Sequence, residues 1–236
     1  MLQKISALGL SLALMFTGGC VIEVDASDWD DDFFSERDNT RDRHRDRDGG
    51  NIHKVFGGIK VHEGETVGNI DSVNGGISMS DNSTGEDVEA VNGSVRIQDK
   101  VSVDSIETVN GSIRAGHSLR VQNDVSTVNG SITLKEGSVI GGGVETVNGS
   151  ITIQGTTVDE NISTLNGDIE VLSGSKVSGD IIFEEKRRKE HNRQRSELVV
   201  DADSVIEGTI HLYQDVELKI EDGAKVGKII DHYHEA

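Results

Sequence analysis

The segment VETVNGSITI, Val144 to Ile153, is one copy of a pattern that recurs through most of the chain. An asparagine–glycine pair marks each copy, and successive asparagines are 18 or 19 residues apart. A step of 18 residues back from the first asparagine reaches Phe56, inside KVFGGIKV, which keeps the pattern without the asparagine. A repeat of this length indicates one structural unit that is stacked many times. The asparagines are Asn74, Asn92, Asn110, Asn129, Asn148 and Asn166.

Two architectures account for such a repeat. Asn-Gly between apolar runs is the usual signal of a β-hairpin, so a meander of hairpins is one prediction. The apolar pair before the turn, Val144 and Val147, is spaced three apart, whereas a strand facing one core needs an even spacing. We interpret the odd spacing as a bend at which both side chains point inward.

A shorter period favours stacked coils over hairpins. Apolar residues recur every six positions, which divides each repeat into three similar sides rather than two. We therefore predict an all-β fold, a single-stranded, three-sided β-solenoid of about nine coils of 18–19 residues over residues 51–231. The residues that carry the period of six are Val91, Ile97, Val103, Val109, Ala115 and Val121.

Each Asn-Gly pair is predicted to form a corner of a coil. Asn tolerates left-handed backbone angles, and Gly adopts them at little cost. Stacking places the six asparagines in a column about 4.8 Å apart, where each amide donates to one neighbour and accepts from the other. The alternative use of the four N-G-S sequences is glycosylation, which the bacterial type of N-terminus described below disfavours.

Beyond Asn166 the corner sequences change to VSGDI, IEGTI and KVGKI. Between the first two, residues 184–197 interrupt the pattern close to where the next Asn-Gly is due, and we predict an insertion loop there. Its basic side chains are candidates for contact with lipid headgroups or other anionic envelope polymers, with a solvated loop as the alternative. They are Lys186, Arg187, Arg188, Lys189, Arg193 and Arg195.

Composition supports strands and excludes one class of partner. Valine and isoleucine supply most of the apolar residues, and proline, which cannot donate to a β ladder, is absent from the sequence. The formal net charge is -19. Such an acidic body is unsuited to binding nucleic acid.

The N-terminus has the pattern of a secretory signal. Lys4 precedes an apolar run from Ile5 to Phe16, which is too short to span a bilayer as a helix. Small residues lead to Cys20, the only cysteine. We predict a lipoprotein signal peptide over residues 1–19 and a lipidated Cys20, because the sequence resembles the bacterial lipobox, although Thr17 stands where leucine is preferred. By analogy with bacterial sorting, Val21 after the cysteine points to the outer membrane, on a side that the residues leave open.

Residues 20–50 carry dense charge of both signs and show no apolar periodicity. Such a segment buries too little apolar surface to fold alone, so we predict a disordered tether between the lipid and the body. Residues 232–236 are predicted to be a short C-terminal tail.

No group of residues points clearly to catalysis or to a metal or other cofactor. His117 is the one histidine on the Asn-Gly repeats. The left-handed β-helix acyltransferases place a histidine at a coil edge, so an acyltransferase or polysaccharide-acting enzyme stays as an alternative. His232 and His234 have a spacing that suits a metal on a strand, but they stand at a chain end. We therefore predict no catalytic residues and no cofactor.

The V-x-x-V-N-G-x-I repeat behind a lipoprotein signal resembles the bacterial putative-adhesin β-solenoids, the auto-transporter-adhesin-head-like group, over residues 51–231. It is similar, more distantly, to the bactofilins, which form polymers. The resemblance implies a right-handed coil and a non-enzymatic, lipid-anchored scaffold or adhesin-like module of the cell envelope. The expected partners are the membrane, an envelope protein or a polysaccharide, and self-association into a bactofilin-like filament is the alternative.

Overall fold

The computed structural model describes residues 14–15, 21–22, 49–185 and 195–234. The chain divides into two compact units, Met1–His44 and Arg45–Ala236. In the first unit, β1 (Leu14–Met15) pairs with β2 (Val21–Ile22) in antiparallel fashion. Cys20, most of the predicted tether, and five of the six basic residues predicted for anionic contact lie outside the described residues.

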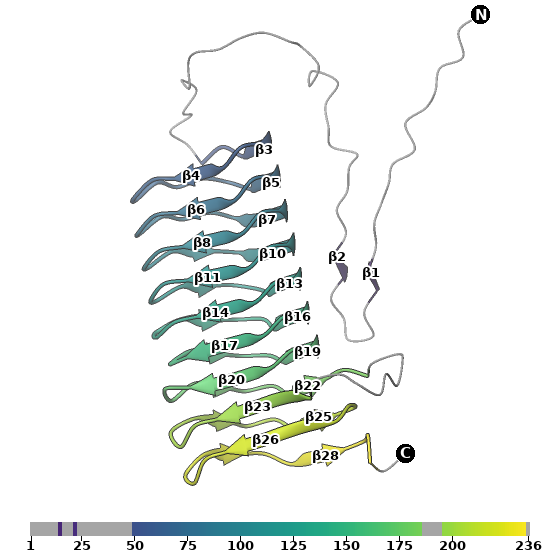
Figure 1. Ribbon diagram of the computed structural model, residues 1–236. Helices are drawn as coiled ribbons and strands as arrows, with labels where there is room; N and C mark the ends of the chain where they lie inside the picture. The colour runs from purple at the N-terminus through teal and green to yellow at the C-terminus, as the bar shows by residue number, and fades with distance from the viewer. Residues whose placement is uncertain (1–13, 16–20, 23–48, 186–194, 235–236) are drawn as a thin grey trace, which may run out of the picture. The chain divides into compact units, whose positions relative to one another are not determined.

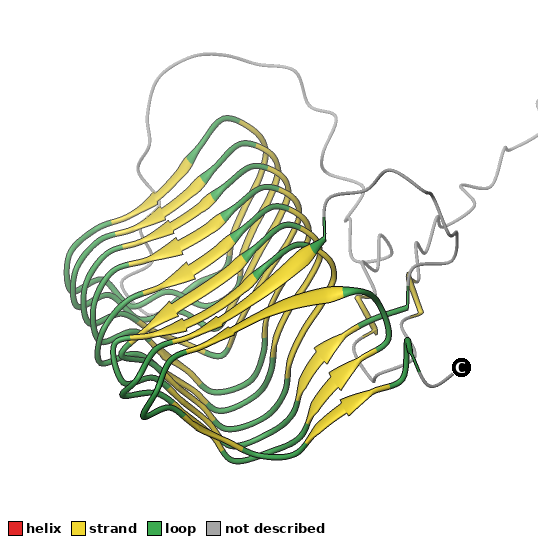
Figure 2. Cartoon of the chain, turned by 60° about the horizontal axis from the view of Figure 1, so that its bottom comes forward, coloured by secondary structure: helices red, strands yellow, loops and turns green. Residues whose placement is uncertain are grey.

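The second unit is a β-solenoid, in which the chain winds through three parallel sheets and returns one strand further along at each turn (Figures 1 and 2). Every described strand pair from Ile52 to Asp231 is parallel, as coils require, so the hairpin alternative is wrong. The prediction of an all-β, three-sided solenoid with about nine turns is confirmed.

Sheet I has ten strands, sheet II nine and sheet III seven. Sheet I contains β3 (Ile52–Phe56), β5 (Ile70–Asn74), β7 (Asp87–Asn92), β10 (Ser105–Asn110), β13 (Val125–Asn129), β16 (Val144–Asn148), β19 (Ile162–Asn166), β22 (Ile181–Phe183), β25 (Ile210–Leu212) and β28 (Ile229–Asp231). Sheet II contains β4 (Ile59–Val61), β6 (Ile77–Met79), β8 (Val95–Ile97), β11 (Ile113–Ala115), β14 (Ile132–Leu134), β17 (Ile151–Gln154), β20 (Ile169–Leu172), β23 (Ser196–Val200) and β26 (Val216–Ile220). Sheet III contains β9 (Ser102–Val103), β12 (Arg120–Val121), β15 (Val139–Ile140), β18 (Thr157–Val158), β21 (Lys176–Val177), β24 (Val205–Ile206) and β27 (Lys225–Val226).

The core is a column of side chains enclosed by the three sheets. In one coil, Ile106 comes from sheet I, Ile113 from sheet II and Val121 from sheet III, and all three are buried. Successive coils repeat these positions in register, as in the pairing of Ile113 with Ile132. Branched side chains suit this column because they pack closely on the pleated surface of a strand.

The odd spacing of Val144 and Val147 does not mark a bend in the strand of sheet I. Strand β16 alternates regularly through Val147, so Val144 and Thr146 point inward while Val147 faces outward and is partly exposed. The expected bend with both valines inside is therefore wrong. The period of six is wrong at the same place, because Ala90 and Thr108 occupy the buried positions expected for Val91 and Val109.

Backbone hydrogen bonds between coils follow a fixed direction. An inward-facing residue such as Val95 donates its N–H to the following coil, at Ser112 O, over 3.0 Å. An outward-facing residue such as Gln98 donates to the preceding coil, at Met79 O, over 2.9 Å. Inward-facing residues thus direct both N–H and C=O toward the C-terminal end of the solenoid.

Strand β22 ends just before the predicted insertion, and strand β23 begins within its predicted bounds. Phe183, the last residue of β22, pairs with Thr164, so Glu185 falls in register with Asn166 and replaces the next Asn-Gly corner. Strand β23 begins at Ser196, and Ser196 and Glu197 therefore belong to sheet II rather than to the predicted insertion.

Candidate functional site

The six predicted asparagines lie in one column at the corner between sheets I and II. Each side-chain amide after that of Asn74 donates to the asparagine one coil before it, over 2.9–3.2 Å. The backbone register pairs the same residues, as in Asn110 with Asn129. The column is largely exposed, so its amide groups are bonded to one another while they remain open to water. The repeated asparagines therefore hold neighbouring coils together.

The glycines after these asparagines are required for a reason other than the one expected. A Cβ built on Gly130 would lie 1.9 Å from the carbonyl oxygen of Gly111 in the preceding coil. The described asparagines of the column have no positive φ; the non-glycine residues with left-handed angles are Asn82, Lys100, Ser118 and Ser173, at the corner between sheets II and III. Of the described glycines after the column asparagines, Gly149 alone has a positive φ, 158°. The prediction that Asn-Gly supplies left-handed backbone is therefore wrong at the other corners of the column, where the close approach of the coils requires glycine.

A second polar column, inside the solenoid, is absent from the sequence predictions. Thr127 Oγ1 donates to Gly111 O over 2.9 Å, and Thr146 Oγ1 donates to Gly130 O over 3.0 Å. Both threonines are buried, so the bond satisfies their hydroxyl groups within the core. The signal available was the small or hydroxyl residue that stands two positions before every asparagine in the repeat.

We expect Asn129→Ala to lower the free energy of unfolding by about 1 kcal/mol. Asn129 donates to Asn110 and accepts from Asn148, so the substitution removes two exposed amide bonds of small net value. Asn166→Ala is the matched control, because Asn166 makes one bond in the column and should lose about half as much. Urea denaturation measures both. Equal losses at the two positions would contradict a contribution from the column.

Carboxyl groups form a row on the outer face of sheet I. Asp71, Glu89 and Glu107 pair in register on adjacent strands. Desolvation, followed by repulsion from Glu89, Asp124 and Asp87, raises the pKa of Glu107 to about 7. Desolvation, followed by the charges of Asp71 and Asp87, also raises the pKa of Glu89. Within the described residues, no group of three or more histidine, cysteine, aspartate or glutamate side chains is arranged to hold a metal.

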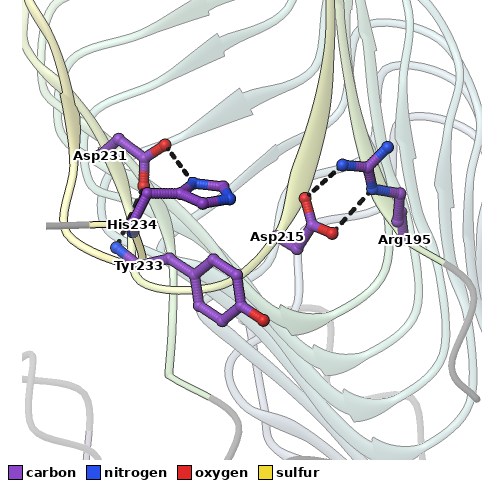
Figure 3. A network of polar contacts seen from close by, with 5 residues as sticks. All are labelled: Arg195, Asp215, Asp231, Tyr233 and His234. Carbon is purple, nitrogen blue, oxygen red and sulfur yellow. Dashed lines mark hydrogen bonds and ion pairs between the residues drawn. The ribbon is translucent and has the colours of Figure 1, made fainter. Parts of the chain in front are cut away.

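Arg195, the described member of the predicted basic set, is paired with an acidic side chain (Figure 3). Its Nε and Nη2 donate to the two carboxylate oxygens of Asp215 over 2.8 and 2.7 Å. The hydrogen bond and the charge of Arg195 hold the pKa of Asp215 below its usual value. The structure therefore places Arg195 in a bidentate ion pair beside the start of β26 rather than on a free basic surface.

His232 and His234, the two histidines with metal-like spacing, have separate partners. His234 Nδ1 lies 2.7 Å from Asp231 Oδ2, and Asp231 Oδ1 also accepts the N–H groups of Tyr233 and His234 (Figure 3). The ring of His232 stacks on Tyr213 with ring centroids 4.3 Å apart, and its Nε2 lies 3.1 Å from His211 Nδ1. These contacts fasten the chain end to the last coils.

His117, the residue of the enzyme alternative, stands in an exposed corner between sheets II and III. Its backbone N–H donates to Asp99 Oδ1 over 2.7 Å, and its Nδ1 lies 3.2 Å from the same oxygen. The backbone hydrogen bond is the main reason why the pKa of Asp99 is lowered. The contacts described for His117 join one coil to the next.

No described helix is long and apolar enough to cross a membrane. Comparison with known proteins gave no match to any family model, curated protein or solved structure.

Proposed function

We propose that the chain is a lipid-anchored protein of the bacterial cell envelope, in which the β-solenoid serves as a non-enzymatic scaffold or adhesin-like binding module. The observation that supports the scaffold role is that the repeated residues form hydrogen bonds between neighbouring coils. Each repeated asparagine bonds to its counterpart one coil away, and four threonines at the repeated inward position bond to glycine carbonyls of the preceding coil. The repetition thus builds a stack of fixed spacing.

A rigid stack is suited to presenting groups in rows. Neighbouring strands bring equivalent outward side chains about 4.8 Å apart, as in the row of Asp71, Glu89 and Glu107. We propose an envelope protein or a polysaccharide as the partner of such a surface, because both offer repeating polar groups. The lipid anchor at Cys20 and the charged segment that follows it support a position close to a membrane.

Metabolic labelling with a radioactive fatty acid tests the anchor. We expect label in the wild-type chain and its recovery with the membrane fraction, because three acyl chains would hold it there. Cys20→Ser should abolish both. Thr17→Leu is the control, since it restores the preferred lipobox residue and should keep the label. An unlabelled wild-type chain in the soluble cytoplasmic fraction would overturn the proposal.

A further inference from the structure

The two ends of the solenoid are unequal. In the first coil the inward-facing Ile59 and Val61 are 3% and 0% exposed. In the last coil the equivalent position on β26, Leu218, is 38% exposed, and Ile229 on β28 is also exposed. The N-terminal end also carries a charge at an inward position, because Lys54 of β3 pairs with Ser72. A charge directed into an edge of this kind prevents another strand from adding to it.

Strand β26 is the last strand of sheet II and carries no such charge at its inward positions. Those positions are Val216, Leu218 and Ile220, which pair with inward-facing residues of β23. The outward-facing Glu221 donates its N–H back to Val200 O over 2.9 Å, as in earlier coils. By the same pattern, the N–H and C=O groups of Val216, Leu218 and Ile220 point away from β23, along the free edge.

The end strand of sheet I, β28, is in contrast short and charged. It ends at Asp231, and the next N–H groups, of His232 and Tyr233, both return to the carbonyl of Leu212 on β25 over 2.9 and 3.1 Å. Asp231, in register with the buried Leu212, brings a carboxylate to an inward position of β28. Of these two sheets, sheet II therefore favours the addition of a strand.

The charges on β26 form a pattern that is its own complement in the antiparallel direction. Glu217 and Lys219 face outward on either side of Leu218. An antiparallel copy related by a two-fold axis through Leu218 sets Glu217 opposite the partner's Lys219, and Lys219 opposite the partner's Glu217. Opposite charges at directly facing positions stabilise an antiparallel pair. A shift of the axis to either neighbour sets two glutamates or two lysines face to face.

The same axis accommodates the edge groups and the core. It brings Val216 opposite the partner's Ile220, and Leu218 opposite the partner's Leu218, as hydrogen-bonded pairs with apolar side chains inside. It also brings Asp215 opposite the partner's Glu221, two like charges. The bidentate contact with Arg195 neutralises Asp215 at this position.

We propose that two copies of this chain associate tail to tail, with their β26 strands joined in antiparallel fashion about a two-fold axis at Leu218. The two cores then become continuous, and the blocked N-terminal ends point away from each other. The interaction is independent of the proposed scaffold role and of the lipid anchor, because it uses only the last coil.

Oxidative cross-linking of the full chain in detergent tests the geometry. Leu218→Cys is expected to give a covalent dimer under oxidation, because facing residues of a hydrogen-bonded pair have Cα atoms about 5.5 Å apart, within disulfide range. Val139→Cys is the matched control, since Val139 is 37% exposed but lies on the side of the solenoid. The wild-type chain controls for Cys20. A monomer with Leu218→Cys, or equal dimer with Val139→Cys, overturns the proposal.

A charge exchange tests the register by sedimentation. Glu217→Lys sets two lysines face to face at both symmetric positions and should raise the dimer dissociation constant about tenfold. The exchanged variant, Glu217→Lys with Lys219→Glu, should restore most of the affinity. Thermal unfolding of each variant shows whether the solenoid is intact, since Lys219 also contacts Glu197. A wild-type monomer at all concentrations, open-ended filaments, or failure of the exchange to restore affinity would each refute the tail-to-tail dimer.

Discussion

Gly130→Ala is expected to destabilise the solenoid by about 3 kcal/mol or more, the largest effect of any single substitution proposed for the body. A methyl group on Gly130 meets the carbonyl oxygen of Gly111 at 1.9 Å and its carbonyl carbon at 2.5 Å. Both atoms belong to backbone that is held by the strands on either side. The clash can be relieved only if two coils separate, and separation breaks ladder hydrogen bonds. Denaturation in urea, followed by circular dichroism, measures the loss.

Gly76→Ser is the matched control for this substitution. Gly76 is in register with Ser94, so serine is already accommodated at the equivalent position of the next coil. In that coil, Ser94 Oγ accepts the N–H of Ser112 over 3.3 Å, and a serine at position 76 can make the same contact. A Cβ on Gly76 would lie 3.0 Å from the carbonyl oxygen of Ser94, against 1.9 Å for the contact at Gly130, so we expect a loss of about 1 kcal/mol or less. Comparable losses for Gly76→Ser and Gly130→Ala would show that the close approach of the coils is not the reason why glycine follows each asparagine of the repeat.

The spacing of the asparagines was enough to predict the register of the coils. The choice of a solenoid over hairpins rested instead on the valine spacing and the period of six, which do not hold at the ends of the sheet I strands. A step of 18 residues back from Asn74 reached Phe56, and these two residues pair on adjacent strands. The same count placed the interruption after Phe183 at the missing corner. Register follows from spacing here because each coil repeats the same inward and outward pattern, and a slip by one residue would expose the core.

The inside of the coil could not be assigned from hydrophobicity alone. Val147 is apolar and Thr146 is polar, yet the threonine is buried and the valine faces outward. A buried hydroxyl is costly unless it finds a partner, and the sequence alone does not reveal that a glycine carbonyl of the preceding coil accepts it over 3.0 Å. Hydrophobic periodicity therefore favoured a bend at Val147 where the strand in fact continues.

The ion pair between Arg195 and Asp215 could not be predicted from the sequence either. Arg195 and Asp215 are 20 residues apart and meet because β23 and β26 are neighbours in sheet II. Arg195 was grouped with the basic residues before it in the chain, although it lies next to the first residue of β23. A charge pattern in the sequence identifies a basic segment. It does not show where the next strand begins, and the position of Arg195 next to that strand is what brings it to Asp215.

The row of carboxyl groups on sheet I gives the body a stability that depends on pH. Glu107 follows Glu89 and Asp71 in register, so stacking brings like charges together at the spacing of the strands. Desolvation on the sheet, followed by this repulsion, raises the pKa of Glu107 from its ordinary 4.5 to about 7. The folded chain then holds a proton that the unfolded chain releases between pH 4.5 and 7.

Stability should therefore fall as pH rises through this window, and Glu107→Gln should remove much of the fall. Each pKa unit corresponds to about 1.4 kcal/mol. Because the carboxyl is partly open to water, we expect the variant to exceed the wild type by about 2 kcal/mol above pH 8 and to match it near pH 4. Exposed Glu63→Gln is the control and should change neither value. Urea denaturation across this range decides, because a gain that is independent of pH would show that the cause is packing and not ionisation.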